Sequence, residues 1–460
     1  MKINRIIIAL AAAVALLASS CSGVRNCAAP QLHLPDTFGE RRDSTTIADM
    51  EWWKFYTDSA LVYIIEETLA HNRDFLAAAA KVEQMRELYG LSKANMLPTL
   101  SGLALVDHET NDYYGEPHSE QPEYSLKARL SWETDLWGGL KWAKRQGLEN
   151  YRASLEDERA LRISLIAEAA SAYIRLMALD NELAIVRRTL FTREENLKKA
   201  KLRYEGGLTS QIVYNQAQVE YASTAALIPG LERQIEEQKN ALTLLMGRYP
   251  ADEIARGKLS MDGPSAADLP LGLPSTLLER RPDIRSAEAS LRSAMAGVGV
   301  AYANRFPNLR IELIGGLEND DIKGFLNSPF TYVLGQIAGP IFDFGRNKRK
   351  YKAAMAAYNQ SRYAYEQKVL NAFREVDDAA TAVKLTIRTT ERRRELREAA
   401  QNYAQLAYVQ YNGGVLNYID VLDAQRRYFE AQVGVNNAVR DEYLALIALY
   451  KALGGGWSNQ

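Results

Sequence analysis

A short stretch with two adjacent glycines occurs twice in this chain. Residues 203–208 read Arg-Tyr-Glu-Gly-Gly-Leu, and residues 410–415 read Gln-Tyr-Asn-Gly-Gly-Val. The offset of 207 residues holds without a gap through further identities on both sides, which are Gly138/Gly345, Ile212/Ile419, Ala217/Ala424, Gln218/Gln425 and Tyr221/Tyr428. Upstream the offset becomes 209, as in Asp74/Asp283 and Pro98/Pro307. The sequence is therefore a tandem repeat, and the slip falls in a loop, where changes of length are tolerated.

Each repeat predicts long helical hairpins. Residues 140–204 contain no proline and only one glycine, Gly147, and residues 346–411 form the second copy. A helix of that length extends about 100 Å. Glycines end both helices and give two turns, which we expect at Gly206, Gly207, Gly413 and Gly414. Return helices over 210–246 and 418–453 carry an alanine-rich heptad.

The two return helices are not expected to be identical. Pro229 should kink the first, whereas Asn436 stands at the matching place in the second. Within the second heptad, Glu442 is the one interruption.

Between a first helix over 59–95 and the long helix, each repeat predicts two strands. Leu126, Leu130 and Trp132 alternate with charged residues, and Leu309 to Leu313 do the same. The predicted strands of about ten residues suit a bilayer, with polar loops over 107–123 and 318–328. The pattern fits a soluble sheet under another layer or a membrane sheet with one lipid face. Trp132 and Trp137 suit an interfacial girdle or core packing.

Four strands cannot stand alone in lipid, because the edges of an open sheet leave backbone groups unpaired. If the strands are transmembrane, the sequence therefore predicts that several chains share one closed sheet.

The N-terminus predicts export. Lys2 and Arg5 precede an apolar run over 6–18, which is too short to span a bilayer and is typical of a signal peptide. Small residues then precede Cys21, so we expect cleavage before Cys21 and covalent lipid on it; the alternative is a plain signal peptide with a chance cysteine. Cys27 has no comparable context and is assigned no role.

Composition and motifs argue against several functions. Charged residues make up 25% of the 460 residues and the net charge is -1, which does not favour a polyanion binder. No nucleophile with a paired base, phosphate loop or dinucleotide fingerprint is present, so we expect no enzyme. The four histidines lie far apart, and we expect no metal site and no cofactor beyond the lipid.

The expected organisation follows from the repeat. It comprises a lipoprotein signal peptide (1–20), a lipidated N-terminal segment (21–58), a first repeat (59–247), a linker near the waist of the structure (248–274), a second repeat (275–454) and a C-terminal tail (455–460).

Several stretches resemble one family. They are Trp52-Trp53-Lys54-Phe55, Asn72-Arg73-Asp74, Leu97-Pro98, Asp135-Leu136-Trp137-Gly138, Arg281-Pro282-Asp283-Ile284, Phe306-Pro307, Pro340 to Arg346 and Tyr411 to Arg426. In this order, and doubled, they resemble the TolC-like outer membrane factors, in particular the NodT/OprM-like lipoprotein branch. The resemblance covers nearly the whole mature chain.

The resemblance implies a mainly α fold with a membrane β-barrel. It implies a homotrimer in which four strands per protomer form one twelve-stranded barrel, and in which the helical hairpins form an α-barrel through the periplasm. The glycine turns would lie at the periplasmic tip, where a periplasmic adaptor (membrane fusion protein) and an inner-membrane pump engage. The function implied is the outer-membrane exit duct of a tripartite efflux or secretion system.

The resemblance also implies a constriction made by Asp420 and Asp423. On a threefold axis they would bring six carboxylates together and attract cations. The alternative is two solvated aspartates near a helix N-terminus, where aspartate is favoured. The first repeat has Val213 and Gln216 at the matching places, and Leu416 stands where some relatives have an arginine.

A second hypothesis is a lipid-anchored periplasmic coiled-coil adaptor. Such adaptors also have long hairpins and lipidated N-termini, but they lack a doubled pair of strands of bilayer length. Fractionation of the membranes distinguishes the two, because an adaptor would stay with the inner membrane.

Overall fold

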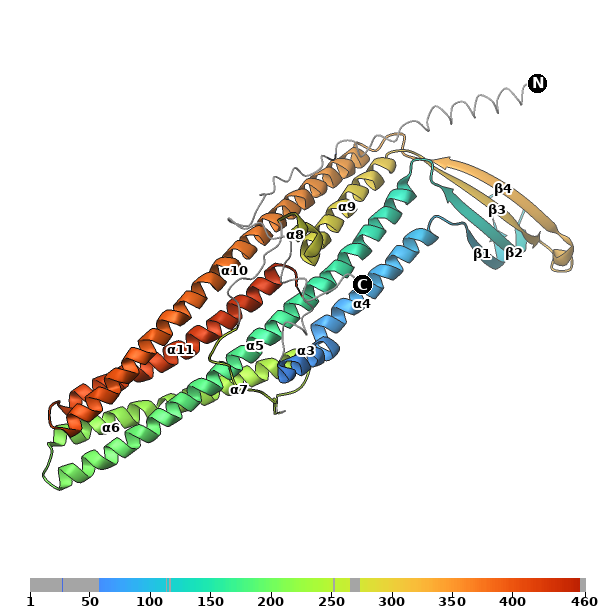
Figure 1. Cartoon of the computed structure of the whole chain (residues 1–460). Coiled ribbons are helices and arrows are strands. Elements are labelled where there is room, and N and C mark those ends of the chain that lie inside the picture. Colours follow the sequence, from blue (N-terminus) through green and yellow to red (C-terminus); the bar gives the residue numbers. More distant parts are fainter. Residues whose placement is uncertain are drawn as a thin grey trace. The chain divides into compact units, whose positions relative to one another are not determined.

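The computed structural model describes residues 27, 58–112, 114–115, 117–250, 253–264 and 274–455. They are mainly helical, with one antiparallel sheet (Figure 1). The first repeat contains α3 (Ser59–His71), α4 (Arg73–Ala94), β1 (Thr99–Asn111), β2 (Ser119–Thr134), α5 (Gly139–Glu205), α6 (Gln211–Ala225) and α7 (Leu227–Leu245). The second contains α8 (Pro274–Arg280), α9 (Pro282–Ala303), β3 (Asn308–Asn319), the 3-10 turn η2 (Phe325–Asn327), β4 (Pro329–Ala338), α10 (Arg346–Asn412) and α11 (Tyr418–Ala452).

The chain forms two compact units, and α5 and α10 contribute to both. One unit holds the sheet and the helical segments 80–94, 139–155, 285–303 and 346–367. The other holds the hairpins, formed mainly by 156–250 and 368–455. Each unit therefore combines parts of both repeats.

The sheet has the strand order β1-β2-β3-β4, and every neighbouring pair is antiparallel (Figure 1). The first hairpin differs from the prediction of a loop over 107–123, because β1 and β2 stay paired as far as Asn111 and Ser119. Polar side chains end the apolar alternation there, but they do not prevent the backbone from pairing. The second connection, with η2, agrees better with the predicted loop over 318–328.

The long helices end within two residues of the predicted positions, at 139–205 and 346–412. The single helix expected over 59–95 is wrong, because Asn72 takes an extended conformation between α3 and α4. Its side chain accepts hydrogen bonds from the backbone N–H groups of Asp74 and Phe75, at 3.0 and 3.1 Å, and so caps α4. The predicted defect at Pro229 is confirmed: the first return helix breaks at Ala226, where α6 ends and α7 begins.

Alanine seams hold the hairpin unit together. Residues of α10 are buried at heptad spacing, among them Ala372, Ala379, Ala400 and Ala407. The predicted heptad of α11 is also buried at Ala424, Ala431 and Ala438. Small side chains at these positions let the helices approach closely along their length, as knobs-into-holes packing requires.

The repeat is visible in hydrogen bonds as well as in sequence. Asn72 Nδ2 donates to the carbonyl of Leu245, 3.0 Å away, and Arg281 Nη1 donates to the carbonyl of Ala452, 3.2 Å away. Asn72 and Arg281 are counterparts at the offset of 209. In both repeats, a side chain at the break between two helices thus satisfies a carbonyl at the end of the return helix.

The second of these junctions is charged. Arg281 is buried, and it forms a two-pronged hydrogen bond with Asp283, at 2.9 and 2.8 Å, and an ion pair with Glu375 at 2.7 Å. Burial opposes ionisation of Asp283, but the hydrogen bonds and charge of Arg281 outweigh burial and hold the pKa of Asp283 below its usual range. The pair therefore stays ionised near neutral pH.

The described part of the linker crosses the hairpins. Gly257 N–H donates to the Tyr173 hydroxyl at 3.0 Å, and Arg394 donates to the carbonyl of Met261 at 2.8 Å. Gly263 lies so close to Glu442 that a Cβ there would sit 3.0 Å from its carboxylate. Glu442 therefore interrupts the heptad at a place where α11 faces the linker as well as α10.

Candidate functional site

One face of the sheet is apolar and exposed. The register places Leu100, Leu130, Leu313 and Val333 in one row across all four strands. Their exposed fractions are 73%, 38%, 43% and 68%. Nothing in the described chain covers this face, although an aqueous protein normally buries such a row.

The opposite face is polar and pairs its charges across strands. Lys127 of β2 lies 2.9 Å from Glu318 of β3, and Glu133 of β2 lies 3.4 Å from Arg310 of β3. A sheet with one bare apolar face and one charged face suits a boundary between lipid and water. The outer strands β1 and β4 pair with no further strand of the described chain.

The two tryptophans predicted as girdle or core residues differ. Trp132 lies on the apolar face and is 42% exposed, with Nε1 donating to the carbonyl of Met96 at 3.1 Å. An exposed ring with its N–H satisfied suits a membrane interface. Trp137 stacks on Phe306, with ring centroids 4.7 Å apart, and Nε1 donates to the carbonyl of Pro307 at 2.7 Å. Trp137 therefore has a packing role.

At the far ends of the long helices, the four predicted glycines form two matching turns. Leu208 N–H donates to the carbonyl of Arg203 at 2.8 Å, and Val415 N–H donates to that of Gln410 at 2.9 Å. This is the Schellman arrangement that ends a helix on a left-handed residue. Gly207 (φ +72°) and Gly414 (φ +77°) are the left-handed residues, whereas Gly206 and Gly413 are not.

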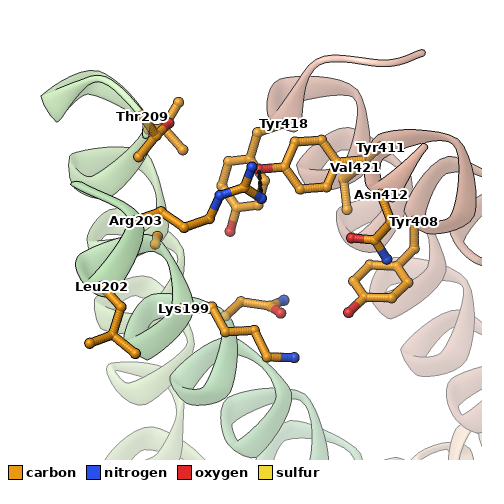
Figure 2. Close-up of a pocket in the computed structure, with 12 residues that line it drawn as sticks. Lys199, Leu202, Arg203, Thr209, Tyr408, Tyr411, Asn412, Tyr418 and Val421 are labelled. Atoms are coloured by element: carbon orange, nitrogen blue, oxygen red, sulfur yellow. Dashed lines mark hydrogen bonds between the residues drawn. The ribbon is translucent and has the colours of Figure 1, made fainter. Parts of the chain in front are cut away.

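A small cavity of about 270 Å³ lies beside these turns, between the two hairpins (Figure 2). Arg203 points across it and donates to the Tyr411 hydroxyl at 3.2 Å. Burial raises the pKa of Tyr418, which also lines the cavity, to about 12. The cavity is therefore lined by tyrosine hydroxyls together with the basic side chains of Lys199 and Arg203.

A partly buried charge network joins the hairpins farther from the turns. Arg193 of α5 is buried and lies 3.0 Å from Glu220 of α6, which also lies 3.3 Å from Arg426 of α11. Arg193 also contacts Thr224 through a hydrogen bond. Removing Arg193 or Glu220 leaves an uncompensated buried charge, so this pair fixes how α5 and α6 pack, whereas the half-exposed Arg426 of α11 contributes less.

Asp420 and Asp423 lie in the first two turns of α11. The side chain of Asp420 accepts from the backbone N–H of Asn417 at 3.2 Å and completes a capping box. Asp423 accepts from Arg427 Nε at 2.8 Å, and this hydrogen bond and charge lower the pKa of Asp423. Both residues thus have local partners in the single chain, and their role in a constriction stays a prediction.

Two further predictions concern the cysteines near the N-terminus and metal binding. Cys21 lies outside the described residues. Cys27 is a half-buried free cysteine whose thiol pKa is raised by burial. Among the described residues, no group of His, Cys, Asp or Glu side chains is arranged to hold a metal ion. None of the helices in this part of the chain is both long enough and apolar enough to cross a membrane.

Comparison with known proteins identifies the family. The family model described as outer membrane efflux protein matches residues 64–248 and 273–455. The chain belongs to this family. The chain is 33% identical to the solvent efflux pump outer membrane protein SrpC of Pseudomonas putida, over 88% of this chain and 87% of the relative. It is 32% identical to the probable outer membrane lipoprotein SilC of Salmonella typhimurium, over 93% and 94% of the two chains.

Solved structures of outer membrane channels have the same fold. The open-state channel MtrE of Neisseria gonorrhoeae superposes with a TM-score of 0.85 at 28% identity, covering 93% of this chain and 97% of that chain. CusC superposes equally well, with a TM-score of 0.85 at 28% identity, over 93% and 98% of the two chains. The outer membrane efflux protein described here is a channel component and not an enzyme, as its sequence predicted.

Sequence reasoning missed the contacts between the hairpins. The bonds from Arg203 to Tyr411 and from Arg426 to Glu220 join residues whose proximity becomes clear only when the hairpins are side by side. One signal was available. Tyr204 and Tyr411 are repeat counterparts beside the two turns, and each stacks or tilts against a neighbouring tyrosine, at 5.8 and 5.5 Å.

Proposed function

We propose that this outer membrane efflux protein is the exit duct of a tripartite efflux system and works as a homotrimer. Three copies would close their four-stranded sheets into one twelve-stranded barrel, with the hairpins extending into the periplasm. The observation that supports this most directly is the exposed apolar row on a sheet whose edges β1 and β4 are both free in the described chain. Closing the sheet with further copies pairs both edges and leaves the apolar row facing lipid.

The proposal extends to the anchor and the partners. Lipid on Cys21 would hold the chain at the membrane. The turns at Gly207 and Gly414 would form the periplasmic tip, which an adaptor and an inner-membrane pump engage. The names of the relatives support this assignment, since SrpC is described as part of a solvent efflux pump.

A matched pair of substitutions tests which face of the sheet meets lipid. Leu130→Arg places a charge in the apolar row, whereas Ser131→Arg places it on the polar face, next to Glu312. An arginine on a lipid face costs about 2–4 kcal/mol near the bilayer midplane. We expect Leu130→Arg to abolish the heat-modifiable oligomer in the outer membrane fraction and the conductance in planar bilayers, and Ser131→Arg to retain both.

Two outcomes contradict the proposal. If both arginine variants insert equally, the row does not face lipid. If the wild-type chain fractionates with the inner membrane and conducts nothing, the adaptor hypothesis replaces the duct.

A further inference from the structure

The repeat provides a template for a contact at the base of the sheet. Trp137 follows β2 and directly precedes Gly138, whose φ is +75°. Its ring stacks on Phe306 at 4.7 Å, and its N–H donates to the carbonyl of Pro307. Phe306 and Pro307 directly precede β3, so this contact closes the base of the β2–β3 pair. Trp137 and Phe306 are both partly buried by it.

The residues at the matching repeat positions could form the same contact, but they lie apart within the chain: one half is in the second repeat and the other is in the first. Phe344 is the counterpart of Trp137 at the offset of 207, and it directly precedes Gly345, whose φ is +80°. Leu97 and Pro98 are the counterparts of Phe306 and Pro307 at the offset of 209, and they directly precede β1. Phe344 is 87% exposed and Leu97 is 66% exposed. Among the described residues, Phe344 and Leu97 therefore each lack the packing partner that Trp137 and Phe306 have in one another.

Phe344 is also held in an unfavourable conformation. Its φ is +51°, and it is the one residue other than glycine with a positive φ among the described residues. In a bulky residue such a conformation carries a steric cost. The ring contact that accompanies it, with Phe342 at 4.5 Å, is itself open to solvent, because Phe342 is 75% exposed. Among the described residues of one chain, none buries the ring and so offsets the cost.

The sheet explains where the missing neighbour lies. β4 and β1 are the repeat counterparts of β2 and β3, and they are the two free edges. If β1 of a second copy pairs with β4 as β3 pairs with β2, its Leu97 and Pro98 reach Phe344. We infer that Phe344 packs on Leu97 and Pro98 of a neighbouring copy, as Trp137 packs on Phe306 and Pro307 within the chain. This inference rests on the proposed homo-oligomer and specifies its contact.

Thiol cross-linking tests the contact directly. In a Cys27→Ser background, chains with Phe344→Cys and differently tagged chains with Leu97→Cys are co-expressed, and the membranes are treated with dibromobimane, which becomes fluorescent when it joins two close thiols. We expect a fluorescent product that carries both tags. Chains with Leu91→Cys, another exposed leucine of the same unit, replace the Leu97→Cys chains as the control and should give at least tenfold less product. A product with both tags that is no more abundant with Leu97→Cys than with Leu91→Cys would overturn the inference.

A second readout does not depend on cysteine chemistry. Phe344→Ser should lower the temperature at which the oligomer dissociates in detergent, whereas Phe344→Trp, which installs the residue of the first repeat, should retain it. If the wild-type chain is monomeric, the proposed oligomer itself fails. If the wild type is oligomeric but Phe344→Ser dissociates like wild type and no cross-link forms, this inference alone fails. Stronger quenching by brominated lipid of the fluorescence of the Phe344→Trp variant than of wild type, without a cross-link, would likewise overturn it by placing this position in the bilayer.

Discussion

Among single residues, Glu442 is a buried carboxylate next to the linker. It is 6% exposed and faces Gly263 of the linker, and Thr390, Arg394 and Glu391 of α10 act on its carboxylate. Burial raises its pKa and outweighs the hydrogen bond with Thr390 and the attraction of Arg394. A raised pKa means that the folded state binds the proton more tightly than the unfolded state does.

The sign of the pH dependence follows from this shift. The stabilisation is fully present below the ordinary glutamate pKa of 4.5 and is lost as the pH rises through the higher pKa of the folded state. Glu442→Gln keeps an oxygen acceptor and removes the buried charge. We expect its apparent melting temperature, measured by circular dichroism, to exceed that of wild type by about 2 °C at pH 8, the shift that about 1 kcal/mol produces in a large domain.

The difference should disappear below pH 4.5, where both side chains are neutral. Glu398→Gln, on an exposed glutamate of α10 that does not act on Glu442, should show no such difference. A lower melting temperature for Glu442→Gln at pH 8 would show that the charged form is the stabilising one.

At the residue scale, the sequence predicted which positions are unusual better than it predicted which residues those positions contact. The heptad interruption at Glu442 could be read, but the linker that faces it could not, because nothing local encodes a contact with Gly263. Asp423 lies four residues before Arg427, a spacing at which helix side chains meet, so this pair was readable. The pair from Arg193 to Glu220 required the hairpin to be formed first.

At the scale of elements, glycine decides where the helices end. The two turns at the hairpin ends have the same hydrogen bonds, and in each pair of glycines only the second is left-handed. Within each pair, Gly206-Gly207 and Gly413-Gly414, the second glycine therefore needs a backbone conformation that the first does not.

Alanine substitution separates the two roles. Gly414→Ala forces a side chain into the left-handed region at a cost of about 1 kcal/mol, although a Cβ there would meet no other atom. We expect hydrogen exchange of the amides around Val415 to speed up about fivefold, as measured by mass spectrometry of the turn peptide. Gly413→Ala, whose Cβ would make ordinary contacts at 3.5 Å, should leave the exchange rate nearly unchanged. Equal effects of the two substitutions would contradict the assigned turn.

Some boundaries of helices and strands could be predicted from the sequence, and others could not. Long helices ended where predicted because glycine acts locally, and the break at Ala226 followed from Pro229. The break at Asn72 was missed because asparagine is only a weak helix breaker, and its capping bonds become apparent only in the structure. Strand ends were missed because pairing between Asn111 and Ser119 does not depend on hydrophobic alternation.

For the whole molecule, the repeat predicted a mainly helical chain with long hairpins, and the structure and family confirm it. The number of chains in the channel cannot be predicted from one chain. The unpaired edges of β1 and β4 indicate only that another strand must pair with each of them. The constriction proposed at Asp420 and Asp423 belongs to this scale, since six carboxylates require three copies.

Neutralising the proposed constriction should change conduction. Asp420→Asn combined with Asp423→Asn removes the charges but keeps an oxygen that can accept from Asn417 and so preserves the cap of α11. We expect higher single-channel conductance in planar bilayers and at least about tenfold weaker block by a trivalent cation, because each carboxylate attracts the ion by about 1 kcal/mol per unit charge even in water.

The matching change Gln216→Asn in the first repeat, which has no carboxylate there, is the control and should leave block unaltered. Unchanged conductance and block in the double variant would assign both aspartates to helix capping and surface pairing alone.

The free edges of the sheet have a consequence for the chain before it assembles. A newly exported copy has an exposed apolar surface and two edge strands that can pair with any extended peptide. Unpaired edge strands of this kind promote aggregation. Its passage through water must therefore be brief or escorted. Copies made faster than they can meet one another should accumulate as insoluble material or be degraded, and not as a soluble pool.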